Sequence, residues 1–223
     1  MEGKANGASG RSDILQTSQR SLAIVIPMYN EVDAVPLLAY KLKAVLKIVD
    51  GLIDTHLVLV DDGSTDMTLR EMRAHFVGDE RVRFVRHWKN QGFGVALRSG
   101  VDAALELGVD LVITIDADTN YDHFYIPYFV DQFSPECDIM TASPWHPAGE
   151  AANFPWRRLI LSKGLSYLYR RVLARYGQPL YCYSACFRIA RADVYRRIHW
   201  TGRDFLATSE IMARCIANGL RVR

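Results

Sequence analysis

The sequence predicts an α/β fold with a mostly parallel central sheet flanked by helices. Through residues 20–120, short runs of β-branched and aliphatic residues alternate with amphipathic segments of helical length, which is typical of parallel α/β sheets. The run Leu111–Ile115 is apolar apart from Thr114, as expected of a strand that helices cover on both faces. With 223 residues and 49% apolar side chains, the chain can bury a large core without disulfide bonds.

Each element has its own signal. Strands are predicted where β-branched or aliphatic residues gather before a turn or polar segment: Ser21–Pro27, Thr55–Val60, Val82–Arg86 and Leu111–Ile115. Helices are predicted where apolar residues recur at helical spacing: Val35–Val49, Met67–Phe76 and Phe93–Leu107. The inward stripe of the first helix includes Tyr40, and that of the third includes Val95 and Leu105. We expect Ser64 or Thr65 to cap the second helix.

Composition excludes several classes of protein. The apolar and charged fractions exclude a disordered chain, and the ordinary glycine and proline counts exclude a collagen-like one. No segment reaches the roughly 18–20 apolar residues of a membrane span. Residues 1–20 are polar and lack the apolar core of a signal peptide. We therefore expect a flexible leader over 1–20, a single domain over 21–223 and a cytoplasmic location.

The cysteines do not form a metal-binding pattern. They are spread along the second half of the chain, and their one close pair, C-x-x-x-C, has no second pair at the spacing of a zinc site. We expect reduced thiols at all four positions, which are Cys137, Cys182, Cys186 and Cys215.

Charge is unevenly distributed along the chain. Residues 1–140 hold 13 basic and 21 acidic residues, a net charge of −8, whereas residues 141–223 hold 14 basic and 4 acidic residues, a net of +10. No acidic residue lies between Glu150 and Asp193. Such a basic face suits an anionic partner such as a phosphate, a nucleic acid or an acidic membrane. The alternative is a solvated surface that faces the acidic half of the chain.

Polar and acidic residues follow three of the predicted strands, at Pro27–Glu31, Asp61–Ser64 and Asp116–Asn120. In a parallel α/β sheet the ligand lies beyond the carboxyl ends of the strands. Carboxylates that share one crevice repel one another unless a cation joins them. Oxygen ligands without thiolate or imidazole favour Mg²⁺ or Mn²⁺, and such an ion usually also bridges the phosphates of a nucleotide.

The strongest single signal is Asp116-Ala117-Asp118, directly after the apolar strand. We expect its two carboxylates to point to opposite faces, so that one binds the metal and the other contacts the ribose or organises the loop. In the second acidic segment, Asp61 can accept a hydrogen bond from a nucleobase N–H. A helix-capping turn explains Asp62 and Ser64 equally well.

The segment Asn90–Gly94 opens the third predicted helix with two glycines. Glycines let a backbone approach a ligand closely, and a helix N-terminus favours an anion. The segment is not the dinucleotide fingerprint, because Leu97 stands where the third glycine is required and the loop follows the third strand rather than the first.

Four motifs occur together in a recognisable order: P-x-Y-N-E from Pro27, V-D-D-G-S from Val60, N-x-G-x-G-x-A-x-R-x-G from Asn90, and D-A-D from Asp116. Together they resemble the inverting glycosyltransferases of family 2, which have the GT-A fold. Two later segments, Trp156–Ser162 and Ser184–Arg188, resemble regions of the dolichol-phosphate and polyprenyl-phosphate mannosyltransferase group. Phe205–Glu210 and Gly219–Val222 resemble its following helix and the start of its next strand.

The resemblance implies roles for individual positions. The positions that hold the base and ribose of a nucleotide sugar match Pro27, Tyr29, Glu31, Leu59 and Asp61, and the D-x-D loop matches Asp116, Ala117 and Asp118. Asp118 and Asn120 match positions that reach Mg²⁺ or Mn²⁺. The catalytic positions are Asp118, Arg158 and Ser162, of which the last two lie near the acceptor phosphate.

Three departures from the family pattern bear on the acceptor. Ser143-Pro144-Trp145 stands where the family has S-R-Y, so an expected phosphate-binding arginine is absent, and His146 or Arg157 is a candidate replacement. Tyr181-Cys182-Tyr183 stands where the family has an acidic residue. The family continues past the position of Arg223 through an E-x-P strand, so we expect the GT-A domain to be truncated at its C-terminus.

The implied activity is transfer of a hexose, with mannose from GDP-mannose as first choice, to a polyprenyl or dolichyl phosphate. The alternatives are UDP-glucose or another donor with a glycan or lipid-headgroup acceptor, and a nucleotide-sugar-binding scaffold with weak catalysis. An acceptor phosphate is already anionic and needs no strong base. A hydroxyl acceptor would need a carboxylate, for which Asp122 is a candidate.

The basic, Leu- and Tyr-rich segment Trp156–Tyr176 predicts a helix that lies in a membrane interface. That contact would be peripheral, on the cytoplasmic face of a membrane. The alternative is a helix that packs on the sheet with its charges in water. We expect no nucleic-acid partner.

Overall fold

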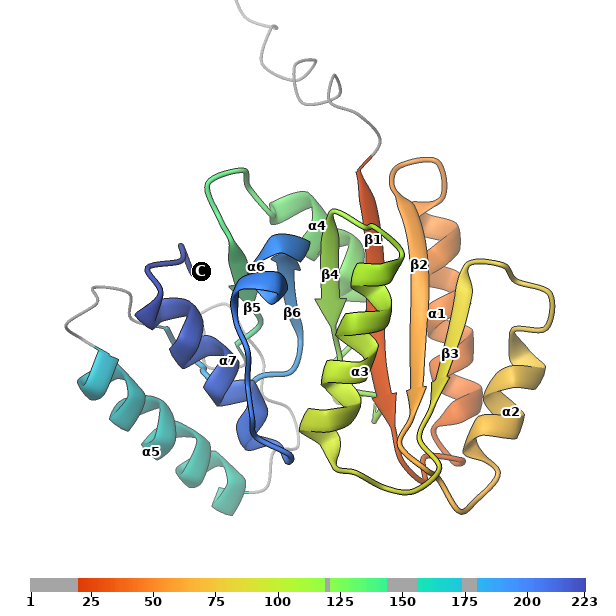
Figure 1. Ribbon diagram of the computed structural model, residues 1–223, viewed down its shortest axis with the longest axis horizontal. Coiled ribbons are helices and arrows are strands. Elements are labelled where there is room, and N and C mark those ends of the chain that lie inside the picture. The colour runs from red at the N-terminus through yellow and green to blue at the C-terminus, as the bar shows by residue number, and fades with distance from the viewer. Residues whose placement is uncertain (1–19, 119–120, 144–155, 174–179) are drawn as a thin grey trace, which may run out of the picture.

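The computed structural model describes residues 20–118, 121–143, 156–173 and 180–223, with only the backbone of 156–163 and of residue 165. These residues form one six-stranded sheet in the order β3-β2-β1-β4-β6-β5, with helices on both faces (Figure 1). Strands β1 to β4 are parallel, and β6 runs antiparallel to both of its neighbours, β4 and β5. The mostly parallel α/β sheet is confirmed.

The predicted elements agree with the structure to within one or two residues at each end. The strands are β1 (Ser21–Met28), β2 (Asp54–Asp61), β3 (Val82–Arg86), β4 (Leu111–Thr114), β5 (Ile139–Thr141) and β6 (Arg188–Arg191). The helices are α1 (Val35–Val49), α2 (Thr68–His75), α3 (Phe93–Glu106), the 3₁₀ helix η2 (His123–Tyr125), α4 (Ile126–Gln132), α5 (Trp156–Leu173), α6 (Ala192–Arg197) and α7 (Leu206–Ala217).

Two apolar layers cover the sheet, because successive residues of a strand face opposite sides. In β1, Ile24 and Ile26 pack with α1, α2 and α4, whereas Val25 packs with α3, α6 and α7 (Figure 1). Two expectations for the inward stripes were wrong in detail. Tyr40 of α1 is 66% exposed and Val95 of α3 is only partly buried, whereas Leu105 packs against the core as expected.

The expected cap of α2 was also wrong. Its first backbone N–H, that of Thr68, donates to Oδ1 of Asp66 at 2.9 Å, and no side chain of the N-cap residue itself takes part. Ser64 instead accepts the backbone N–H of Asn30 at 3.0 Å, and the backbone N–H of Thr65 donates to Oδ1 of Asn30 at 2.9 Å. Asn30 has a left-handed backbone with φ of 54°, which asparagine tolerates better than most residues. These bonds join the loops that follow β1 and β2.

The last residues of the chain lie beside β5. Val222 pairs with Ile139 in parallel orientation, and the backbone N–H groups of Asp138 and Thr141 donate to Arg221 and Arg223. Val222 therefore makes an isolated parallel bridge at the outer side of β5, where the resemblance implied the start of a strand.

The four cysteines, all within the described residues, are buried and unpaired, which confirms the expected thiols. Within the described ranges, no helix combines the length and the hydropathy that crossing a membrane requires.

Candidate functional site

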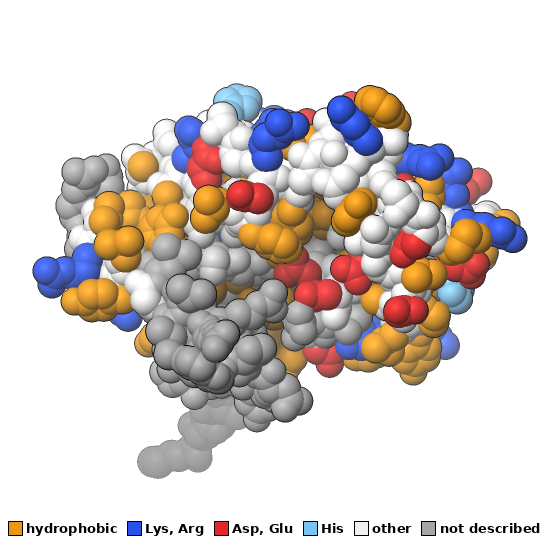
Figure 2. All heavy atoms as spheres, turned by 90° about the horizontal axis from the view of Figure 1, so that it is seen from below, with side chains coloured by type: hydrophobic (Ala, Val, Ile, Leu, Met, Phe, Trp, Pro, Cys, Tyr) orange, Lys and Arg blue, Asp and Glu red, His pale blue; other side chains and the backbone are white. Residues whose placement is uncertain are grey.

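Four acidic residues lie where the carboxyl ends of β1, β2 and β4 meet. The registers place Met28 beside Asp61 in the β1–β2 ladder, and β4 lies on the other side of β1. Glu31 follows β1 and Asp61 ends β2, while Asp116 and Asp118 follow β4. Figure 2 looks onto this edge and shows several acidic side chains gathered right of centre. We name Glu31, Asp116 and Asp118 the acid cluster.

The members of the acid cluster repel one another. Burial, and secondly the charge of Asp118, raise the pKa of Asp116 to about 7. Burial also raises the pKa of Glu31, to which the charges of Asp118 and then Asp66 contribute. Like charges at short range disfavour ionisation. The cluster therefore holds more negative charge than its surroundings compensate, and this is the environment that a cation stabilises.

Asp116 and Asp118 do not divide between opposite faces as we expected. The charge of Asp118 is close enough to raise the pKa of Asp116, which favours a shared side, as positions two apart have in an extended chain. Ala117 lies between them, buried in the core with Ile113 and Ile115. What distinguishes the two aspartates is depth, because Asp116 is half-buried and Asp118 is exposed.

Arg188 is the buried counter-charge of this edge. It is 1% exposed, lies opposite Thr114 in the β4–β6 ladder, and its charge opposes the rise in the pKa of Asp116. Its Nη2 donates to the backbone oxygen of Tyr183 at 2.9 Å, and its Nε has no partner among the described residues. The segment that ends at Arg188 had been matched to the mannosyltransferase group, but this role had not been predicted.

The two aspartates of the D-D-G-S loop have different surroundings. Oδ1 of Asp61 accepts the backbone N–H of Ser64 at 3.1 Å, while Oδ2 is buried without a hydrogen-bond partner in the described chain. Nε of Arg86 lies 3.6 Å from that Oδ2. Asp61 therefore retains one acceptor for a ligand.

Asp62 is occupied by the protein itself. Its Oδ1 lies 2.6 Å from Nδ1 of His87 and accepts the backbone N–H of Gln91 at 3.0 Å, and its Oδ2 accepts that of Gly92 at 2.9 Å. Nε2 of His87 lies 2.9 Å from Oγ of Ser99. We had not singled out Arg86 or His87, although both stand at the carboxyl end of a predicted strand, where the other candidates were found.

The two glycines of the Asn90–Gly94 segment have a packing role that the sequence did not predict. A side chain at Gly92 or Gly94 would meet the backbone of Arg203 or Gly202. The N–H of Gly94 donates to the carbonyl of Arg203 at 2.9 Å, and Nε1 of Trp200 donates to the carbonyl of Gly94 at 3.0 Å. These glycines therefore admit the segment before α7.

Of the remaining predicted site residues, some have described side chains and others do not. Tyr29 is 43% exposed just beyond β1. Pro27 is buried within β1, and Leu59 is buried in the core of β2 with no exposed surface. Asn120 and His146 lie outside the described residues. So do the side chains of the α5 residues Arg157, Arg158 and Ser162, although the backbone of that helix is described.

A divalent cation fits the donor set of the acid cluster. Among the described residues, no three His, Cys, Asp or Glu side chains are arranged to hold a metal ion by themselves. Mg²⁺ commonly takes only one or two carboxylates from a protein and completes its shell with water and substrate phosphates. The exposed Asp118 beside two carboxylates of raised pKa matches that mode of binding.

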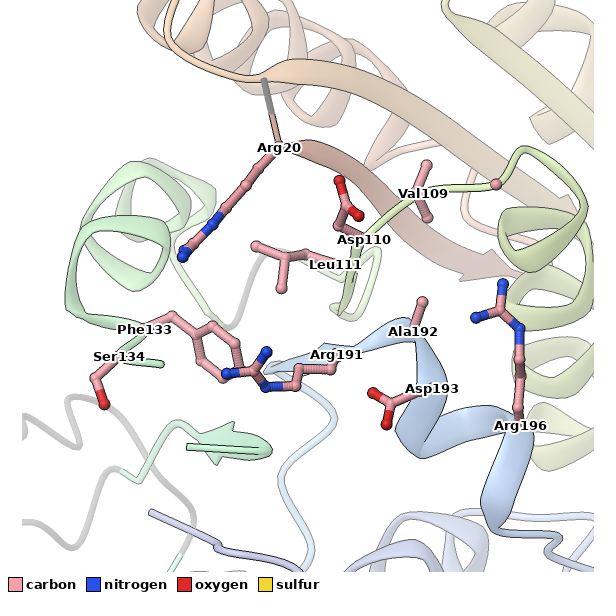
Figure 3. Close-up of a pocket in the computed structure, with 11 residues that line it drawn as sticks. Arg20, Val109, Asp110, Leu111, Phe133, Ser134, Arg191, Ala192, Asp193 and Arg196 are labelled. Atoms are coloured by element: carbon pink, nitrogen blue, oxygen red, sulfur yellow. The ribbon is translucent and has the colours of Figure 1, made fainter. Parts of the chain in front are cut away.

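A cavity of about 390 Å³ lies near the amino ends of β1 and β4, at the other end of these strands from the acid cluster (Figure 3). Among the residues that line it, the side chains of Arg20 and Arg191 extend toward Phe133. Arg191 already donates to the backbone oxygens of Pro135 and Cys137, and the lining carboxylate of Asp110 accepts from Ser21. No residue that the sequence marked as a site residue lines this cavity.

Comparison with known proteins identifies the family. The family described as glycosyl transferase family 2 matches residues 23–198. Polyprenol monophosphomannose synthase of Mycolicibacterium smegmatis is 28% identical over 98% of this chain and 80% of its own length. Undecaprenyl-phosphate mannosyltransferase of Micrococcus luteus is 29% identical over 78% of this chain and 68% of its own length.

Solved structures agree with the fold. Glucosyl-3-phosphoglycerate synthase of Mycobacterium tuberculosis, in complex with Mn²⁺, UDP and glucosyl-3-phosphoglycerate, superposes with a TM-score of 0.68 at 17% identity. The match covers 91% of this chain and 69% of that one. The predicted GT-A fold is thus confirmed, and the chain belongs to glycosyl transferase family 2.

Proposed function

We propose that this glycosyltransferase moves mannose from GDP-mannose to a polyprenyl phosphate. One observation carries the donor half of the proposal: the acid cluster and the unpartnered Oδ2 of Asp61 lie at the same edge of the sheet. The names of two relatives, a polyprenol monophosphomannose synthase and an undecaprenyl-phosphate mannosyltransferase, support the acceptor and the sugar.

The nucleoside would lie over the ends of β1 and β2. Oδ2 of Asp61 would accept the ring N–H of the base, with the guanidinium of Arg86 beside it. The exposed ring of Tyr29 and the carboxylate of Glu31 would contact the base and ribose. Pro27 and Leu59, which are buried in β1 and β2, would pack beneath this nucleoside site. Guanine and uracil each offer one ring N–H next to a carbonyl, so this geometry suits GDP-mannose and also UDP-glucose.

Asp118 and Asn120 are the residues that would hold Mg²⁺ or Mn²⁺, with Asp116 and Ala117 shaping the loop. A bound divalent ion supplies Lewis acidity that neutralises the charge of a departing diphosphate. The role of the chain is to keep the carboxylates together despite their repulsion, which the buried charge of Arg188 helps to offset.

In the transfer, an acceptor phosphate oxygen would form a bond to the anomeric carbon as the bond from that carbon to the diphosphate breaks, with inversion. Arg158 and Ser162 of α5 would hold the acceptor phosphate. Because the attacking oxygen is already anionic, positioning and electrostatics would supply most of the rate.

Two carboxylates near this edge are engaged elsewhere, which favours an acceptor that needs no base. Oδ1 of Asp122 lies 3.2 Å from Nζ of Lys41 and also accepts the backbone N–H of Phe124 at 3.2 Å. Glu210 accepts the backbone N–H groups of Thr201 and Gly202, and Nε of Arg214 at 2.8 Å. Asp122 is therefore occupied as a structural residue.

Peripheral contact with a membrane would occur through Trp156–Tyr176, on the cytoplasmic face. In the described side chains of α5, Tyr167, Leu168 and Val172 are exposed next to the exposed Arg170 and Arg171. Apolar and aromatic groups beside arginines suit the headgroup region of an anionic lipid surface.

A nucleotide-release assay tests the proposal. GDP-mannose and UDP-glucose are each incubated with Mg²⁺ or Mn²⁺, with and without a polyprenyl phosphate, and nucleoside diphosphate is measured. We expect release of GDP only when GDP-mannose, metal and lipid are all present, its loss in Asp118→Ala and its retention in the matched control Asp193→Ala, which removes an exposed aspartate of α6. Release of UDP with a glycan or a lipid headgroup, or nucleotide binding without release, would contradict the proposal.

A further inference from the structure

The segment that leads into α7 presents an exposed cation beside exposed apolar side chains. Arg203 is exposed, and within the described ranges its guanidinium makes no hydrogen bond or ion pair. Phe205 is 66% exposed, and Leu206, the first residue of α7, is 62% exposed. The carboxylate of Asp204 is engaged, because its Oδ1 accepts the backbone N–H of Leu206 at 2.9 Å. We name Arg203, Phe205 and Leu206 the α7 patch.

The fold holds the α7 patch in place without burying it. The backbone N–H of Gly94 donates to the carbonyl oxygen of Arg203 at 2.9 Å. The ring of Phe205 stacks on that of Phe93, with 4.3 Å between the ring centroids. Neighbouring apolar groups that the fold fixes at the surface are typical of interaction sites. The patch is therefore a candidate binding surface.

The α7 patch lies at the same edge of the sheet as the acid cluster. The N–H of Gly92 donates to Oδ2 of Asp62, just beyond β2, and two residues later Gly94 bonds to Arg203. In Figure 1, α3 and α7 both begin at the end of the molecule toward which the arrows of β1, β2 and β4 point. Helix α7 also contacts α5, the helix proposed to hold the acceptor phosphate. The patch thus adjoins the elements of both proposed sites.

A phosphate joined to a hydrocarbon chain matches the chemistry of the α7 patch. A guanidinium binds phosphate oxygens through charge-assisted hydrogen bonds. The exposed faces of Phe205 and Leu206 would lose water on contact with a hydrocarbon, which is favourable. The acid cluster makes this edge negative, so an anionic acceptor needs a cation such as Arg203 to approach it. A water-soluble phosphate would leave the apolar side chains unused, and a neutral lipid would leave Arg203 without a partner.

We infer that the α7 patch binds the polyprenyl phosphate acceptor: the guanidinium of Arg203 donates to its phosphate, and Phe205 and Leu206 contact the first isoprenoid units of its chain. The inference rests on the proposed function and deepens it, because it assigns the residues that distinguish a lipid phosphate from a water-soluble one. These residues determine acceptor specificity.

The test is a calorimetric titration with farnesyl phosphate, a short polyprenyl phosphate, and with inorganic phosphate as the probe that lacks a chain. We expect Arg203→Gln to bind both probes about ten-fold more weakly than the parent, as for the loss of a hydrogen bond to a charged group. Phe205→Ser with Leu206→Ser should bind farnesyl phosphate about ten-fold more weakly, because apolar contact is lost. The same double variant should bind inorganic phosphate as the parent does.

Two matched controls lie away from this edge. Arg196→Gln removes an exposed arginine of α6, and Leu52→Ser removes a leucine that is 76% exposed before β2. Both should bind farnesyl phosphate like the parent. The α7-patch variants should still bind GDP with Mg²⁺ like the parent, which a folding defect would not allow. Arg203→Lys, which keeps the charge without the planar fork, should have intermediate affinity.

The outcomes separate the inference from the proposed function. If the parent binds farnesyl phosphate and the α7-patch variants bind it equally well, the inference is wrong while the proposed function stands. The inference is also wrong if Arg203→Gln weakens both probes while the double serine variant weakens neither, because the patch then holds a phosphate without its chain. If the parent neither binds farnesyl phosphate nor transfers mannose to a polyprenyl phosphate, the proposed acceptor fails and the inference fails with it.

Discussion

Oδ1 of Asp62 lies 2.6 Å from Nδ1 of His87, and both side chains are buried. This relationship separates two neighbouring aspartates that look alike in the sequence. Asp62 holds the segment 87–92 against the end of β2 through the ring of His87 and two backbone N–H groups. Asp61, one residue earlier, keeps an oxygen without a hydrogen-bond partner in the described chain, with Nε of Arg86 3.6 Å away.

The two aspartates should therefore respond differently to substitution. We expect Asp62→Ala to lower the free energy of unfolding by about 3–5 kcal/mol, because it leaves buried donors without their charged acceptor. Asp61→Asn should leave stability nearly unchanged but weaken binding of GDP or UDP by about 1–3 kcal/mol. Urea unfolding and calorimetric titration of both variants measure these effects. The distinction is wrong if Asp61→Asn unfolds the protein or binds nucleotide like the parent.

A second prediction concerns pH and the C-terminal segment. Hydrogen bonds from Arg221 lower the pKa of Asp138 from 3.8 to about 2. The folded state therefore binds fewer protons than the unfolded state between these values, so the stabilisation is complete above pH 4 and is lost as pH falls toward 2. Asp138→Asn should destabilise the protein at pH 7 and progressively less below pH 4. Denaturant unfolding across this pH range measures the difference in the free energy of unfolding between the parent and Asp138→Asn. A difference that does not change with pH would contradict the lowered pKa of Asp138.

A third prediction concerns the glycines of α3. A Cβ at Gly94 would meet the carbonyl of Gly202 and the side chain of Ala207. Gly94→Ala should therefore lower the free energy of unfolding by about 1–3 kcal/mol, as overpacking does. Gly164 of α5 has open space around it, so Gly164→Ala is the matched control and should keep or slightly raise stability. Equal effects of the two substitutions in thermal unfolding would refute the packing argument.

A fourth prediction concerns α5 and lipid. Each basic residue near an anionic surface contributes about 1 kcal/mol, an effect that salt screens. The protein should therefore sediment with anionic vesicles, less so at high salt, and Arg170→Glu with Arg171→Glu should release it. Arg196→Glu with Arg197→Glu, the same charge change on exposed residues of α6, should not. A protein that stays in the supernatant at low salt would exclude this mode of membrane contact.

Much of the fold follows from local patterns. Strands β1 to β4 and helix α1 were predicted because apolar periodicity within a short segment already determines which face is buried. The same reasoning placed Glu31, Asp61, Asp116 and Asp118 at one edge, since parallel strands align their carboxyl ends. Local patterns did not reveal that β6 lies antiparallel between β4 and β5, because the order of strands in a sheet depends on connections between distant segments.

The sequence by itself determined the fold class, the family motifs and the acidic edge of the sheet. Only the tertiary structure decided which aspartate of D-D-G-S keeps an oxygen without a hydrogen-bond partner in the described chain, why Gly92 and Gly94 lack side chains, and that His123 is buried. Each of these depends on partners far away in the chain, such as His87 for Asp62, Arg203 for Gly94 and Lys41 for Asp122. Whether a carboxylate or a glycine serves a ligand or the fold depends on what packs against it, and packing between distant segments exists only in the folded chain.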